Sequence, residues 1–499
     1  MSRFTELCAT FAKEGPLNRD IMAPRRRSPE WSLLPIAASL EKSTQETAVP
    51  TAFPRCYLKP FVERLKKNRE DAAAALYRKR KKLLIEQQGN QFSTEKAQDY
   101  LNLLTGAITS WGDPKNIPIL KRFGVVVHET YNSFFKEIRT EPSDPDKGSY
   151  YPPMIDLSGD DHWGPHAING REMLEFNDSS IGVISLPVSY GSHPLLWTTL
   201  AHEVGGHSAM NGLAGRRGAF WAVRDVPAEI EEAVGAVTGL AQGWNKVWQH
   251  WAIEAAADVY GLLFMGPYFI VSLTAWLSAA KAIDPFGPQT KIGCLENVLY
   301  LRNGMLADDH PPDILRLWIA LGVADAMIEK NHHHARSWIE LFDEIGLDAK
   351  GAATTLDVHD IMVGGISCQL ELKPLLQDAR KIGKLIATAS LKSLGRDGGS
   401  RAIIDMLAWT NDDEQSAAAI KKIAASNTPL TQSGPGKPEA AHLLAGATMA
   451  VYDRPGDYSK INRFLDAALE ARYPFTQYAQ PAPTSRQAQS IPSRAETRG

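Results

Sequence analysis

Hydrophobic residues recur at helical spacing over most of the chain after residue 195. This period predicts helices over 195–211, 228–240, 244–264 and 268–282, with further helical segments to about residue 425. A linker-like stretch, SNTPLTQSGPGKP, separates them from a last pair of helices at about 439–451 and 459–471. No repeat period is evident. The pattern therefore predicts a mainly α fold.

One short stretch before these helices has a different character. GVISLPVSY, residues 182–190, is rich in β-branched residues and predicts a strand. Pro187 lacks the N–H that a central strand uses, so we expect an edge strand. The fold class is then mainly α (α+β), with a small sheet before the helix at 195–211. Such an edge could bind an extended peptide around Val183 to Ser189 by backbone pairing.

Composition divides the chain into five segments. We expect a loosely ordered lead-in over 1–54, an N-terminal helical region over 55–150, a main domain over 151–427, a C-terminal helical pair over 439–472 and a disordered tail over 473–499. The boundary near residue 150 follows from the Pro-, Asp- and Gly-rich segment EPSDPDKGSYYPP.

Charge and composition narrow the functional classes. The 499 residues include 54 Lys and Arg against 57 Asp and Glu, so no overall field attracts nucleic acid or an anionic membrane. Residues 55–82 hold eleven basic and three acidic residues, and the run Arg78 to Lys82 on this predicted helix is the only candidate nucleic-acid patch. It could contact phosphate or an acidic partner, or form a solvated helix face.

The four cysteines are widely separated and form no CxxC pair, so we expect reduced thiols and no cysteine zinc cluster. The N-terminal residues include charges where a signal peptide would be apolar, and no apolar span reaches 18 residues. These features predict a cytoplasmic protein without a membrane partner. The oligomeric state has no sequence signature.

The strongest chemical signal lies in the helix expected to begin near Ser192 and Pro194. Its sequence, LLWTTLAHEVGGHSAM, contains His202, Glu203 and His207. In the commoner HExxH motif, two histidines four residues apart bind zinc on one helix face, and the glutamate activates water.

Here the histidines are five residues apart. On a regular α-helix five steps turn the second imidazole about 140° from the first, so the two could not share one ion. A π-type turn would return both to one face. Gly205 and Gly206 would ease that distortion. Each glycine costs about 1 kcal/mol in an ordinary α-helix relative to alanine, so two of them in this segment indicate special backbone geometry.

A third ligand is expected from the segment WNKVWQHWAIEAAADVYGLLF. Glu254 and Asp258 lie four residues apart, on one helix face bordered by alanines that allow close packing. Glu254 would complete the ligand set, and Asp258 could accept the free ring N–H of a ligating histidine. The alternative is an ordinary polar face, although acids in an apolar segment are costly.

A further candidate is His310 in ADDHPPDILRL, where two prolines stiffen the loop. His310 could donate a hydrogen bond to the oxygen that becomes negative during amide hydrolysis. It could equally be structural, with Arg316 pairing to a loop acid: Asp308, Asp309 or Asp313. Three tyrosines are other possible donors or packed residues: Tyr190, Tyr260 and Tyr300.

Two other groups attract attention. His332, His333 and His334 resemble a metal-binding tract, but adjacent helix positions point in different directions, which favours a solvated helix end. Three tryptophans at helical spacing are expected in the core: Trp244, Trp248 and Trp251.

The segments HEVGGH and EAAAD together resemble zinc metallopeptidases of the gluzincin group, in the HExxxH form found in dipeptidyl peptidase III. The resemblance implies Zn²⁺ bound by His202, His207 and Glu254, with Glu203 as general base and Asp258 in contact with a ligand. Residues 151–427 would then be a zinc metallopeptidase-like domain. The second motif of dipeptidyl peptidase III opens with two acidic residues, whereas this chain has Ile253 and Glu254 at those positions.

We therefore expect a zinc-dependent hydrolase that cleaves a peptide or small amide substrate, with Glu203 and His310 as catalytic residues. Two alternatives stay open. One is a zinc enzyme that acts on a non-peptide small molecule. The other is a non-catalytic binding protein in which the metal only holds helices together.

Overall fold

The structure of this protein is a computed structural model. It describes residues 2–14, 106–107, 110–138, 152–157, 165–168, 182–210, 226–283, 291–351, 353–362, 366–395, 399–426 and 439–476. The predicted basic helix with Arg78 to Lys82, Cys56 and the tail beyond residue 476 lie outside the described residues.

The described residues are mainly helical, as predicted. The α-helices are α1 (Arg3–Glu14), α5 (Ile117–Ile138), α8 (Val226–Gly235), α9 (Trp244–His250), α10 (Ala252–Met265), α11 (Pro267–Ile283), α12 (Asp313–Glu329), α13 (Arg336–Lys350), α14 (Leu372–Thr388), α15 (Ile404–Leu407), α16 (Asn411–Ser426), α17 (Ala440–Asp453) and α18 (Tyr458–Glu470). Shorter 3₁₀ segments are η4 (Val188–Ser192), η5 (Pro194–Thr199), η7 (His333–Ala335), η8 (Lys392–Leu394), η9 (Pro455–Asp457) and η10 (Tyr473–Phe475).

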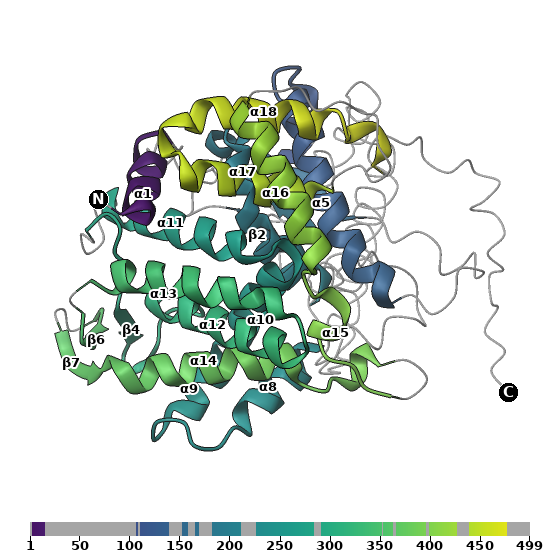
Figure 1. Cartoon of the computed structure of the whole chain (residues 1–499). Coiled ribbons are helices and arrows are strands. Elements are labelled where there is room, and N and C mark those ends of the chain that lie inside the picture. Colours follow the sequence, from purple (N-terminus) through teal and green to yellow (C-terminus); the bar gives the residue numbers. More distant parts are fainter. Residues whose placement is uncertain are drawn as a thin grey trace, which may run out of the picture.

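Helix α10 is the centre of the packing. It contacts α8, α11, α12, α14 and α17, and nearly all its residues are buried. Figure 1 shows α16, α17 and α18 together at the top of the view, with α12, α13 and α14 below them. A helix buried on all sides must be apolar all round, so the two acids of α10, Glu254 and Asp258, need partners inside the protein.

The first sheet contains β1 (Met154–Asp156), β2 (His166–Ile168) and β3 (Val183–Ser185), in the order β1-β3-β2. Strand β3 pairs in parallel with β1 and antiparallel with β2, so it is the central strand. The prediction of an edge strand is therefore wrong. The strand ends at Ser185, and Pro187 follows it in a turn where a missing N–H breaks no ladder.

The second sheet was not predicted. It contains β4 (Val298–Arg302), β5 (Met305–Leu306), β6 (Thr355–Asp360) and β7 (Ile366–Glu371), in the order β5-β4-β6-β7. The turn between β4 and β5 has a positive φ at Asn303 and at Gly304, as a two-residue hairpin requires. The sequence signal was the Asn-Gly pair between apolar residues. This hairpin leads directly into the loop that carries His310.

The start of the chain is more ordered than predicted. Helix α1 lies within the expected lead-in, yet it buries Phe4, Leu7, Cys8 and Phe11 against α11 and α17. Their spacing of three and four residues is that of an amphipathic helix. The prediction of loose order is wrong for α1, and residues 15–54 lie outside the described residues.

Other expectations fare better. The C-terminal helical pair is present as α17 and α18, and both pack against α5 and η5. Trp248 and Trp251 are fully buried in the core, and Trp244 packs against it. Cys8, Cys294 and Cys368 are free thiols. Among the described helices, none has both the length and the apolar character needed to cross a bilayer.

Candidate metal centre

The segment with the two histidines is a π-helix, η6 (Ala201–Ala209), and not the α-helix expected over 195–211. It follows the 3₁₀ helix η5, which has Pro194 in its first turn and His193, not Ser192, at its N-cap. The N–H of Met210 donates to the carbonyl of Gly205 at 3.0 Å, a bond to the fifth residue back. The predicted π-type distortion is confirmed, and it extends over nine residues. The five-residue spacing therefore places His202 and His207 on one side.

The two glycines of η6 allow it to approach α10 closely. A Cβ atom at Gly205 would lie 1.7 Å from Cε1 of Tyr260, and one at Gly206 would lie 2.2 Å from Cβ of Ala257. Neither glycine has a positive φ. Their role is therefore close helix contact, where only glycine fits, and not an unusual backbone angle.

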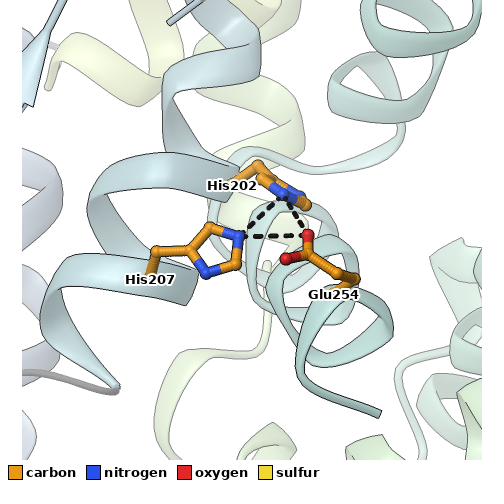
Figure 2. Close-up of side chains that lie close together, drawn as sticks. All are labelled: His202, His207 and Glu254. Carbon is orange, nitrogen blue, oxygen red and sulfur yellow. Dashed lines mark hydrogen bonds and ion pairs between the residues drawn. The ribbon is translucent and has the colours of Figure 1, made fainter. Parts of the chain in front are cut away.

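Three side chains from η6 and α10 point toward one another, as Figure 2 shows. Nε2 of His202 and Nε2 of His207 each lie 3.1 Å from Oε2 of Glu254, and the two nitrogens are 3.0 Å apart. Zinc binds such ligands at about 2.0–2.2 Å, so ligand atoms around a tetrahedral ion lie about 3.3 Å apart. The three predicted ligands thus converge with nearly the separation that a divalent ion requires, and they form a group that could hold a metal ion.

Asp258 holds the far side of the His202 ring. Its Oδ1 lies 2.9 Å from Nδ1 of His202, which is the contact expected from the sequence. Arg316 donates to the same carboxylate, from Nε to Oδ2 at 2.7 Å and from Nη2 to Oδ1 at 2.6 Å. An ionised carboxylate only accepts hydrogen bonds, so Nδ1 of His202 carries a proton, and Nε2 is the nitrogen that faces Glu254 and His207 and could bind a metal ion.

The pairing of Arg316 differs from the alternative that the sequence left open. The sequence suggested a brace to Asp308, Asp309 or Asp313, whereas the guanidinium binds Asp258, 58 residues away in the chain. Nothing in the local spacing of α12 indicates this partner. Only the packing of α12 against α10 brings the two together.

The electrostatics of the site favour a cation. Burial alone would lower the pKa of His202, but hydrogen bonds with Asp258 and Glu254 raise it to about 9. Burial alone would raise the pKa of Glu254, but hydrogen bonds from His202, His207 and His310 hold it well below its usual range. Because the carboxylate stays ionised among nitrogens that attract protons, a metal ion can replace those protons.

His310 lies at the edge of this group. Its Nε2 is 3.0 Å from Oε2 of Glu254, its Nδ1 is 3.0 Å from Oδ1 of Asp308, and its ring lies 6.2 Å from the ring of His202. Burial alone would lower the pKa of His310, but Asp308 and Glu254 raise it to about 10. His310 is thus a protonated donor beside the three converging side chains, and it does not belong to the ligand group itself.

Glu203 is half-buried next to His202 in η6. Among the described residues its carboxylate forms no hydrogen bond or ion pair with another side chain or backbone group. It nevertheless contributes to the raised pKa of His202 through its negative charge. No described residue therefore competes with a bound molecule for this carboxylate.

The three candidate tyrosines have their hydroxyl groups engaged elsewhere. The hydroxyl of Tyr190 accepts a hydrogen bond from Nε1 of Trp276 at 2.7 Å. Tyr260 donates to the carbonyl of Thr130 at 3.0 Å, and Tyr300 donates to Oε1 of Glu296 at 2.6 Å. They are packed residues, whereas His310 lies beside the three converging side chains, with its ring nitrogens on Asp308 and Glu254.

No protein-family model, curated protein or solved structure matches this chain. The resemblance to gluzincin peptidases therefore depends on the local motifs and on the geometry described above.

Proposed function

We propose that this protein is a zinc-dependent hydrolase, and specifically a metallopeptidase. The observation that carries the proposal is the convergence of His202, His207 and Glu254 within 3.1 Å of one another, with His202 held from behind by Asp258. Two imidazoles and one carboxylate form a known donor set of catalytic zinc sites. A bound zinc ion would act as a Lewis acid that polarises water and the substrate carbonyl.

The number of ligands favours catalysis over a structural role. Structural zinc sites have four protein ligands, whereas catalytic sites have three and one open position. In the described part of the chain, the group contains three such side chains. A tetrahedral ion on these three side chains would have one position left for water or substrate.

Two further side chains would transfer the proton and stabilise the negative charge that develops on the substrate. Glu203, which has no other partner among the described residues, would take the proton from the attacking water and return it to the leaving amine. His310, whose Nδ1 is held by Asp308, would donate from Nε2, which lies on Oε2 of Glu254 in this structure, to the oxygen that becomes negative.

The sheet next to η6 does not offer the peptide-binding edge expected around Val183 to Ser189. Strand β3 pairs with β1 on one side and with β2 on the other, so its backbone groups are already used within the sheet. An extended peptide therefore cannot pair with β3.

The test is Glu203→Gln in the full chain, with zinc content by elemental analysis and cleavage of a peptide library with and without a chelator. We expect about one zinc per chain in both proteins, and a loss of turnover of roughly 10²- to 10⁴-fold in the variant. Glu232→Gln, an exposed position on α8, is the matched control and should cleave like the wild type. Full activity of Glu203→Gln, or cleavage that a chelator does not stop, would refute the proposal.

A further inference from the structure

We infer that Arg316 is a positioning residue of the metal site, which fixes the His202 ring through Asp258. The inference rests on the proposed function, because it concerns how that zinc site is built. It assigns to α12 a part in metal binding, although α12 supplies no ligand.

The contact between Arg316 and Asp258 is a two-point contact. Nε and Nη2 of the guanidinium each donate to a different carboxylate oxygen, at 2.7 and 2.6 Å. Asp258 is 2% exposed and Arg316 is 5% exposed, so water does not compete for these bonds. A planar fork on a carboxylate fixes its plane, which a single hydrogen bond cannot do. Arg316 therefore sets the direction in which Oδ1 of Asp258 faces.

That oxygen in turn sets the orientation of His202. Oδ1 of Asp258 accepts hydrogen bonds from Nη2 of Arg316 and from Nδ1–H of His202, the latter at 2.9 Å. Nη2 also lies 3.3 Å from Nδ1. The ring is thus held at the nitrogen opposite to the one that faces Glu254 and His207. A rotation of the Asp258 carboxylate would turn Nε2 away from the other two ligands.

The helix that carries Arg316 is itself held rigidly. A Cβ atom at Gly322 of α12 would lie 1.8 Å from the carbonyl oxygen of Arg380 in α14, and one at Gly383 of α14 would lie 2.0 Å from the carbonyl oxygen of Ile319. The two backbones are therefore in direct contact and cannot slide without a clash. A rigid base is what a positioning residue needs.

A second two-point ion pair on α12 gives a control for a link between helices, although its side chains are more exposed than those of Arg316 and Asp258. Arg380 of α14 donates from Nε to Oδ2 of Asp325 in α12 at 2.6 Å and from Nη2 to Oδ1 at 2.8 Å. No histidine contacts Asp325 in the described part of the chain. If Arg316 served only to join two helices, the two arginines would have similar effects on metal binding.

The experiment measures the zinc affinity of the full chain by competition with a chelating dye. Arg316→Lys keeps the charge but can contact one oxygen at a time, so we expect zinc binding to weaken about 10- to 100-fold. Arg380→Lys should bind zinc like the wild type. The activity of Arg316→Lys should return toward the wild-type value as free zinc is raised, because the ligands themselves are intact.

A lone substitution at a buried ion pair can prevent folding, so a double variant is included. Asp258→Asn with Arg316→Gln removes both charges together, and circular dichroism checks that it folds. We expect its zinc affinity to fall at least as far as that of Arg316→Lys. Zinc affinities equal to the wild type in Arg316→Lys and in the double variant, or an equal loss in Arg380→Lys, would overturn the inference alone. A wild-type chain that binds no zinc would overturn the proposed function and the inference together.

Discussion

Two groups of histidines in this chain resemble metal sites in the sequence and differ in the structure. His202 and His207 are five residues apart and meet a carboxylate from another helix, Glu254. His332, His333 and His334 are adjacent, yet Nε2 of His334 donates to the carbonyl of Trp409 at 2.9 Å, and no metal-binding group includes these three among the described residues. Convergence from separate elements, and not closeness in sequence, builds a ligand set.

The local backbone explains the difference. His333 and His334 begin the short 3₁₀ helix η7, in which successive side chains point about 120° apart. His202 and His207 lie in a π-helix, whose repeat brings positions five apart back to one side. Histidines in the π-helix η6 can therefore face one shared point, whereas adjacent histidines in η7 cannot.

The largest effect is expected when a ligand is removed. His202→Ala, His207→Ala and Glu254→Ala should each reduce zinc content from about one per chain to less than about a tenth, because two remaining ligands bind zinc poorly. Inductively coupled plasma mass spectrometry after dialysis measures this. Stoichiometric zinc in all three variants would show that the metal binds elsewhere.

The next effect concerns the contact between η6 and α10. In Gly206→Ala the added methyl would meet the Cβ of Ala257 at 2.2 Å and its Cα at 2.4 Å. A backbone atom cannot move aside, so η6 must shift away from Glu254. We expect a loss of about 1–3 kcal/mol of stability together with weaker zinc binding. Gly456→Ala, with open space around the added methyl, is the control, and both are compared by urea unfolding and zinc competition.

A third kind of histidine sharpens the comparison. His128 in α5 is largely buried, its Nδ1 has no hydrogen-bond partner among the described residues, and burial together with Arg472 lowers its pKa to about 4. In the unfolded chain His128 takes up a proton near pH 6.5, whereas in the folded chain it takes one up only near pH 4. The free energy of unfolding therefore falls as the pH falls through this window. From pH 7 to pH 5 the loss is about 2 kcal/mol.

His128→Leu should remove that loss, so the gap in unfolding free energy between the variant and the wild type should change by about 2 kcal/mol from pH 7 to pH 5. Urea unfolding in the presence of a chelator measures it without interference from the metal. His333→Leu is the control, because His333 is exposed. A pH dependence that is unchanged in His128→Leu would contradict this account of its burial.

The sequence was sufficient to name the three side chains that converge, because each signal lies within one segment. The spacing of His202 and His207 required a π-type turn, and the acids in an apolar helix required partners, so Glu254 and Asp258 could be named. The partner of Arg316 and the central place of β3 depend on packing between segments far apart in the chain, which no local pattern records. The hairpin at Asn303 and the apolar stripe of α1 do have local signals, namely the Asn-Gly pair and the spacing of Phe4, Leu7, Cys8 and Phe11.

The smallest effect is expected in the adjacent histidines. His334→Ala loses one hydrogen bond to the carbonyl of Trp409, which should cost about 1 kcal/mol. Replacing His332, His333 and His334 together should leave the zinc content at the wild-type value, since none of them faces the ligand group. His207→Ala, measured beside it, shows what the loss of a true ligand looks like. If the triple variant lost zinc and His207→Ala kept it, the two histidine groups would have exchanged roles, and the geometry of η6 would have to serve another purpose.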